Sequence, residues 1–233
     1  MRITAKAISL TISVMVIVGA ILILSRQDWG LLSLEIIVIA LCFFYWVCEK
    51  KSFSAKYLSV LAALSSIAAI SRVPFAILPG VQPTTFLIIS TGLIFGPQAG
   101  FLAGSTAAVL SNFFLGQGPW TPWQMFAWGM AGSTAGLLKI ICPKIGRNGI
   151  ILFSFFWGYL FGWIMNIWSW TAFISPLNIN SFLIVNIASF WFDSFHALGN
   201  AVFCLIFNNS LEKILKHFQR KLEISEIIKE AKV

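Results

Sequence analysis

The chain has 233 residues, of which 58% are apolar and only 10% are charged. An average soluble domain is about 45–50% apolar and about 25% charged, so this composition excludes a water-soluble fold. A spanning helix uses about 20 apolar residues, which gives the chain room for up to about eight such helices and excludes a nucleotide-binding domain. The net charge of +8 does not indicate nucleic acid as a partner, because excess Lys and Arg on a membrane protein encode its orientation.

Eight apolar runs predict eight membrane-spanning helices and an all-α integral membrane fold. In chain order the runs cover residues 7–24, 31–48, 57–70, 84–95, 99–115, 123–141, 150–170 and 182–207. The first run follows Arg2 and Lys6 and is longer than the apolar region of a signal peptide, so we expect a retained anchor.

The distribution of basic residues predicts a cell-membrane protein with both termini in the cytoplasm. With the N-terminus inside, 14 of the 16 Lys and Arg residues lie in inner segments, and only Arg26 and Arg72 lie outside. Three parts follow from this layout. Residues 1–55 form an N-terminal transmembrane hairpin, residues 56–208 form a six-helix core, and residues 209–233 form a cytoplasmic tail whose apolar residues recur at helical spacing.

The outer segment 116–128, GQGPWTPWQMFAW, combines stiff and permissive backbone with aromatic rings and amides. Tryptophan faces and glutamine amides suit a large, partly aromatic, neutral ligand. The candidate binding residues are Gln117, Trp120, Trp123, Gln124 and Trp128. The alternative is an aromatic belt at the membrane interface, where tryptophan is enriched in any case.

The eighth run contains Asp193, His196 and Asn200, whose spacings of three and four place them on one helical face. An acid inside an apolar helix is costly and indicates a functional site by default. The alternative is a structural cluster that ties this helix to a neighbour through Asn112 or Asn166. We expect no metal, because the second histidine lies in the tail and further ligands are missing, and no catalytic triad, because a nucleophile elbow is absent.

Arg72 ends the third run on the outer side. It can pair with an anionic ligand group or a lipid phosphate, or simply extend to the interface. Small residues four apart in the third and fifth runs indicate close helix contact, either within the bundle or with another membrane subunit. These candidates for a subunit interface are Ser59, Ala62, Ala63, Ser66, Ala69, Gly100 and Gly104.

Three elements together resemble the substrate-binding S components of energy-coupling factor (ECF) vitamin transporters. They are residues 72–104, RVPFAILPGVQPTTFLIISTGLIFGPQAGFLAG, the segment GQGPWTPWQMFAWGMAG, and the Asp193-x-x-His196-Ala197-x-x-Asn200 element. The last two resemble the branch linked to cobalamin and related corrinoids. The likeness covers residues 57–208, and the first two runs exceed the usual six helices.

The resemblance implies a non-enzymatic vitamin-capturing subunit without a cofactor. It implies docking on a membrane coupling (T) subunit driven by two ATPase subunits, and the chain itself has no phosphate-binding loop. The implied site adds Arg72, Gln82 and Asn166 to the tryptophans, the glutamines, Asp193 and His196. The expected substrate is cobalamin or a corrinoid-related compound. Riboflavin, a queuosine precursor and a ribazole remain alternatives, as do a stand-alone transporter and a membrane-embedded enzyme.

Overall fold

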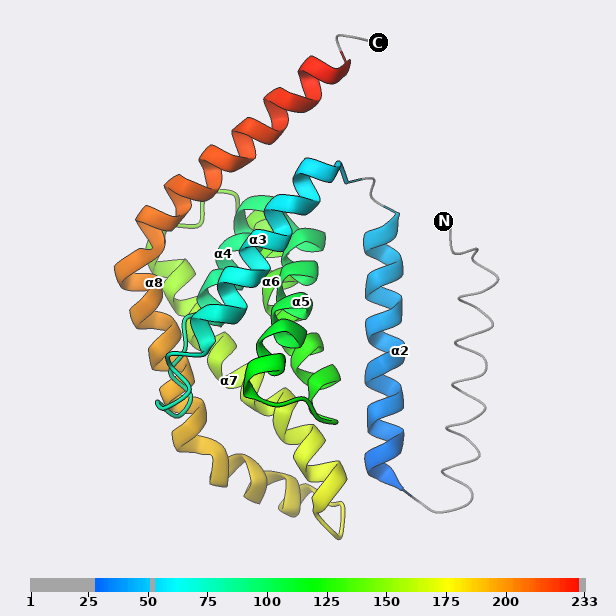
Figure 1. Ribbon diagram of the computed structural model, residues 1–233. Helices are drawn as coiled ribbons and strands as arrows, with labels where there is room; N and C mark the ends of the chain where they lie inside the picture. The colour runs from blue at the N-terminus through cyan, green and yellow to red at the C-terminus, as the bar shows by residue number, and fades with distance from the viewer. Residues whose placement is uncertain (1–27, 51–52, 231–233) are drawn as a thin grey trace.

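The computed structural model describes residues 28–50 and 53–230, so the first predicted span lies outside the described residues. The described part forms seven α-helices and contains no strand (Figure 1). This confirms the all-α prediction, and every predicted run from residue 31 onward lies inside one helix. The helices are α2 (Trp29–Glu49), α3 (Ala55–Arg72), α4 (Thr84–Phe95), α5 (Pro97–Leu115), α6 (Thr121–Ile141), α7 (Arg147–Phe173) and α8 (Ile179–Glu230).

Local sequence signals set several helix boundaries. α3 begins after Ser54, whose side chain accepts a hydrogen bond from the backbone N–H of Tyr57 and caps the helix. Only Gly96 separates α4 from α5, and its φ of 93° is a left-handed conformation that glycine adopts without steric cost. Pro97 then takes the first helical position of α5, where a missing N–H has no consequence.

Membrane-crossing capacity differs among the helices. α2, α7 and residues Ile179–Ile224 of α8 are long and apolar enough to cross a membrane, and α4 is a shorter apolar helix. α4 is also the most enclosed helix, because ten of its 12 residues are buried. An apolar helix without an amphipathic pattern is expected in such a central position.

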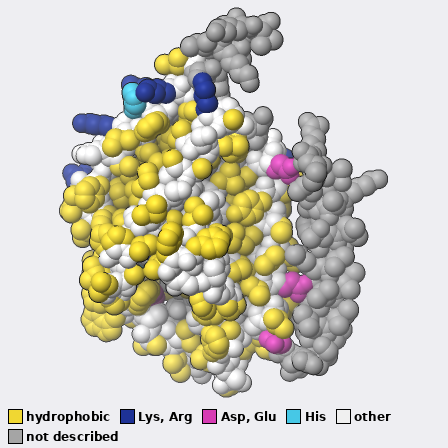
Figure 2. Space-filling model, in the orientation of Figure 1, with side chains coloured by type: hydrophobic (Ala, Val, Ile, Leu, Met, Phe, Trp, Pro, Cys, Tyr) yellow, Lys and Arg dark blue, Asp and Glu magenta, His cyan; other side chains and the backbone are white. Residues whose placement is uncertain are grey.

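The helices run between two chemically different ends (Figure 1). We call one the loop end, because it carries the connections 73–83, 116–120 and 174–178, and the other the basic end. The basic end carries the α6–α7 connection and the projecting part of α8. Figure 2 shows Lys and Arg side chains gathered where α8 projects, whereas hydrophobic side chains are spread over the rest of the described face.

Helices α5 and α6 approach each other through glycines. A Cβ atom on Gly100 would collide with the backbone carbonyl of Gly132, and one on Gly104 would collide with the backbone of Trp128. Small residues permit this close backbone contact in a membrane bundle. Both glycines are buried inside the chain, so the predicted contact of Gly100 and Gly104 with a separate subunit is replaced here by contact with α6.

We expect Gly100→Ala to destabilise the bundle, because the added methyl group meets backbone that cannot rotate away. Overpacking of this kind costs about 1–3 kcal/mol or more. Gly149→Ala in α7 is the matched control, since its Cβ would meet only the flexible side chain of Ile145. Thermal unfolding in detergent measures both. Equal stability of the two variants would contradict the close α5–α6 contact.

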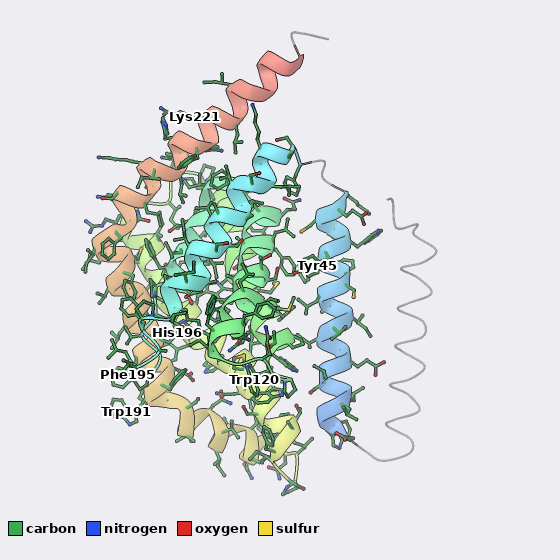
Figure 3. All side chains as sticks on the ribbon, viewed as in Figure 1. Tyr45, Trp120, Trp191, Phe195, His196 and Lys221 are labelled. Carbon is green, nitrogen blue, oxygen red and sulfur yellow. The ribbon has the colours of Figure 1, made fainter. Side chains whose placement is uncertain are left out.

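Helix α2 is packed on the core although it belongs to the predicted extra hairpin. The hydroxyl of Tyr45 donates a 2.8 Å hydrogen bond to Ser105 Oγ, and the ring of Phe44 stacks on Phe101 with centroids 4.8 Å apart. In Figure 3, Tyr45 points from α2 toward α5. This helix therefore adds to the six-helix core along the side formed by α5, α6 and α7.

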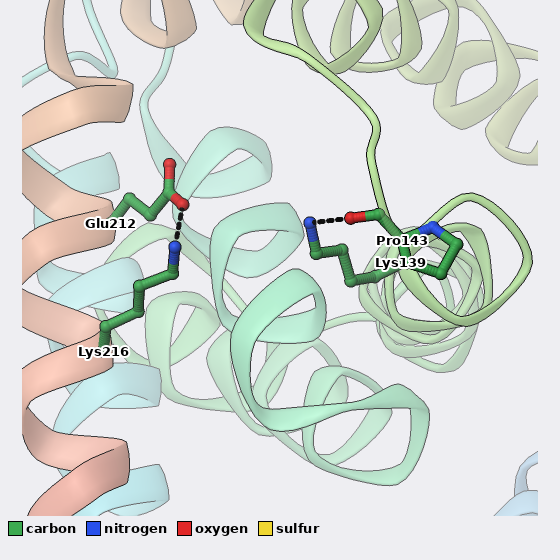
Figure 4. Close-up of polar contacts among 4 residues, drawn as sticks. All are labelled: Lys139, Pro143, Glu212 and Lys216. Atoms are coloured by element: carbon green, nitrogen blue, oxygen red, sulfur yellow. Dashed lines mark hydrogen bonds and ion pairs between the residues drawn. The ribbon is translucent and has the colours of Figure 1, made fainter.

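Helix α8 continues without a break past residue 208, the predicted start of the tail. Leu215 and Leu222 are buried in a cluster with Leu61 and Phe95, which attaches the projecting part of α8 to α3 and α4. The polar contacts nearby are local. Glu212 pairs with Lys216 at 2.5 Å, and the amino group of Lys139 donates to the carbonyl of Pro143 (Figure 4).

Candidate ligand-binding site

Arg72, the last residue of α3, lies among neutral oxygens at the loop end. Its Nε donates a hydrogen bond to Gln82 Oε1, and its Nη1 donates to Ser111 Oγ and Asn112 Oδ1, all at 2.9 Å. Its guanidinium carbon lies 4.8 Å from the centroid of the Trp128 ring, within cation–π range. These contacts join α3, α5, α6 and the loop 73–83 around one cation.

A second layer of amide contacts extends this network. Asn112 is 1% exposed, and its Nδ2 donates to Gln124 Oε1 at 2.7 Å and to Thr121 Oγ1 at 3.0 Å. The Thr121 hydroxyl donates in turn to Gln117 Oε1 at 3.0 Å. Gln117 itself is exposed, and Gln124 is buried. The two predicted glutamines are therefore linked through Asn112 and Thr121 to Arg72.

Trp128 connects the arginine network to α8. Its indole N–H donates to Thr85 Oγ1 at 2.9 Å, and the same oxygen lies 2.8 Å from His196 Nε2. Phe161 of α7 packs on both rings, with centroids 4.7 Å from Trp128 and 5.0 Å edge-on from His196. Figure 3 shows His196 on the side of α8 facing the bundle, whereas Trp191 and Phe195 lie on its outer side. We call Arg72, Thr85, Trp128, Phe161 and His196 the arginine–aromatic cluster.

The loop 73–83 is fixed to α8 beside this cluster. Gly80 has a φ of 74°, and a Cβ atom there would lie 2.6 Å from the carbonyl oxygen of Phe192 and 3.1 Å from the backbone nitrogen of His196. Glycine is required for both reasons, because a side chain would be strained and would push the loop away. The loop therefore lies directly over the part of α8 that carries His196.

Asp193 belongs to a neighbouring polar cluster between α7 and α8. Its Oδ2 accepts a 2.7 Å hydrogen bond from Ser189, and Asn166 Nδ2 donates to Ser189 Oγ at 2.7 Å and to Asn186 Oδ1 at 3.0 Å. Gly162 faces the carboxylate with no room for a side chain. Asn166 is thus linked to Asp193 through Ser189. This matches the alternative in which Asp193 belongs to a structural cluster that ties α8 to a neighbouring helix.

The other two predicted tryptophans, Trp120 and Trp123, take no part in the ring contacts and hydrogen bonds described for the arginine–aromatic cluster. Trp120 is half-buried and meets the ring of Trp168 edge-on, with centroids 5.8 Å apart. Trp123 is only 5% exposed, and its indole N–H has no hydrogen-bond acceptor among the described residues. Figure 3 places Trp120 near the α5–α6 connection at the loop end.

Comparison with known protein families matches residues 52–217 to the family described as "ECF-type riboflavin transporter, S component". The chain belongs to this family. No curated protein and no solved structure matches it. An S component is a vitamin-uptake subunit of a membrane transporter and not an enzyme. The match therefore confirms the prediction of an ECF S component. The match does not extend to the cobalamin-related branch that the sequence analysis favoured.

The S component brings together only part of its predicted site. Arg72, Gln82, Gln124, Trp128 and His196 meet around one network, and Asn166 and Asp193 form the adjacent cluster. The contributions of Thr85, Ser111 and Phe161 were missed. Their side chains are of kinds that occur in any helical bundle, so the sequence carried no signal for them.

The α3 residues predicted to contact the coupling subunit differ in their exposure. Ser59, Ala62 and Ala63 of α3 are exposed and Ser66 is half-exposed, whereas Ala69 is 1% exposed. Ala69 packs in the core with Ala68 and Ile88. The accessible small-residue face of α3 is therefore shorter than predicted and consists of Ser59, Ala62, Ala63 and Ser66.

Proposed function

We propose that this S component binds a water-soluble vitamin with a flat heteroaromatic ring, riboflavin in the first place, at the arginine–aromatic cluster. The observation that carries the proposal is the cluster together with the amides of Gln82 and Asn112 that bond to Arg72. It gathers two aromatic residues, a histidine and amide side chains beneath the loops of one end of the bundle. The family name favours riboflavin. Sites for small ligands combine apolar and aromatic lining with a few convergent polar groups.

Each part of the cluster has a proposed role. The faces of Trp128 and Phe161 pack on the ring system, since aromatic pairs favour offset or edge contact. Gln82 and Gln124 exchange their present partners for polar atoms of the vitamin. His196 and Asp193, which are both buried on α8, orient the inner edge of the vitamin. The loop 73–83 covers the site, so the vitamin reaches it when this loop leaves α8.

The test is titration of the purified protein with riboflavin, followed by quenching of flavin fluorescence. We expect saturable, equimolar binding, because stacking on tryptophan quenches the flavin. Cobalamin, added as a competitor, is expected to leave the curve unchanged. Binding of cobalamin without binding of riboflavin would replace the proposed substrate by the corrinoid class, and mass spectrometry of the co-purified small molecule would identify it independently.

We further propose that α3 docks on the coupling subunit, which two ATPase subunits drive. The hydroxyls of Ser59 and Ser66 donate to the carbonyls of Ala55 and Ala62 at 2.9 and 2.8 Å. Because both hydroxyls are hydrogen-bonded within α3, the small-residue face needs no further polar partner in lipid. Such a face permits close approach of a second membrane helix.

A further inference from the structure

In the part of the chain that the structure describes, Arg72 carries a positive charge without an acidic partner. All three acceptors of its hydrogen bonds are neutral, namely a glutamine, a serine and an asparagine oxygen. The sequence contains no Asp or Glu between Glu49 and Asp193, and Asp193 is turned toward Ser189. The ion pair that the described residues do form joins Lys216 to Glu212, and it lies at the basic end (Figure 4).

Arg72 is half-buried, so this arrangement is less favourable than one in which another group supplies the negative charge. Charges removed from water are normally paired, since an uncompensated buried charge is strongly destabilising. Neutral oxygens and the Trp128 ring compensate Arg72 only partly. The cation–π contact with Trp128 offsets only part of the cost of removing the guanidinium from water.

The guanidinium also has N–H donors that these hydrogen bonds do not use. Arginine has five N–H donors arranged in a fixed fork that matches carboxylate and phosphate oxygens. Nε and Nη1 of Arg72 are engaged, and Nη2 has no acceptor among the described residues. Arg72 is moreover the only Lys or Arg between residues 57 and 138, so within this stretch no other cation competes for an anion at the loops 73–83 and 116–120.

We propose that Arg72 binds an anionic group of the vitamin, a phosphate monoester or a carboxylate, so that the preferred ligand is an anion. The proposal rests on the proposed function and refines its substrate. If the ring is a flavin, the phosphorylated form, flavin mononucleotide, is preferred over riboflavin. The phosphate pairs with Nη2, while Nη1 stays bonded to Ser111 and Asn112 and holds the guanidinium in place.

Riboflavin and flavin mononucleotide form a matched pair of probes, because they differ only by the phosphate. We expect the unmodified protein to bind the mononucleotide about tenfold or more tightly than riboflavin, the strength of a charge-assisted contact. Arg72→Gln removes this preference while riboflavin binding changes less, and Arg72→Lys retains part of it. Arg220→Gln, a change at an exposed residue of α8, leaves it intact. Equal binding of both flavins to the unmodified protein overturns the proposal whether or not the variants fold.

A second arm separates this inference from the choice of vitamin. If neither flavin binds, the proposed substrate is wrong, and inorganic phosphate still probes Arg72. We expect phosphate, but not chloride at equal ionic strength, to raise the unfolding temperature of the unmodified protein and not of Arg72→Gln. Absence of this stabilisation overturns the proposal. Stabilisation by phosphatidylglycerol in the micelles without any effect of phosphate also overturns it, because Arg72 would then bind a lipid headgroup.

Discussion

Thr85→Val is expected to destabilise the protein and to weaken vitamin binding by about tenfold or more. The Thr85 hydroxyl is fully buried and serves two rings, since it accepts from the Trp128 indole and lies 2.8 Å from His196 Nε2. Valine has the same shape and leaves both groups without a partner. An unsatisfied buried polar group costs about 1–3 kcal/mol. Thermal unfolding and ligand titration in detergent measure the two effects.

The neighbouring Thr84→Val is the matched control. Thr84 is equally buried, but its hydroxyl donates only to the carbonyl of Ala68, at 3.1 Å. That carbonyl lies inside α3 and can keep a backbone partner there, so the cost is smaller and the aromatic rings are untouched. Equal losses in the two variants would show that the Thr85 hydroxyl has no special part in the cluster.

The helices were predictable from the sequence because polar breaks bound the apolar runs. The run 84–95 coincides with α4 at both ends, since Pro83 precedes it and the Gly96–Pro97 pair ends it. The end of α8 was not predictable in the same way. Charged residues begin near 212 without any glycine or proline, so the helix continues where the composition changes.

The site was predictable in its chemistry and not in its pairings. Arg72, Trp128 and His196 stand out as unusual residues in an apolar chain. Their partners lie 10 to 111 positions away along the sequence, and helix rotation decides which side chains meet. Thr85 is ordinary by sequence, because a threonine in a membrane helix usually bonds to its own backbone.

Small residues illustrate the same limit. Gly100 and Ala63 both belong to small residues spaced four apart, which indicates close contact but not its partner. The structure uses Gly100 within the chain and leaves Ala63 exposed. Only the three-dimensional arrangement separates a contact inside the bundle from a surface open to another subunit.

Ala63→Phe is therefore expected to stop uptake while leaving vitamin binding unchanged. The added ring projects from the exposed face of α3, so it finds room in lipid and leaves the core intact. A second helix could no longer approach closely, which removes the packing that drives helix association in membranes. Uptake of labelled vitamin by cells that contain the coupling and ATPase subunits, together with binding to the purified variant, measures the two properties separately.

Ala188→Phe provides the matched control, because Ala188 is an exposed alanine of another helix, α8. Both changes add the same ring to a surface in lipid, so a general effect on insertion or expression would appear in both. Loss of uptake in Ala63→Phe alone assigns docking to α3. Normal uptake in Ala63→Phe would remove α3 from the docking surface, and the exposed faces of other helices would then have to supply it. Ala69→Phe cannot decide the question, because Ala69 is buried and its replacement would disrupt the bundle itself.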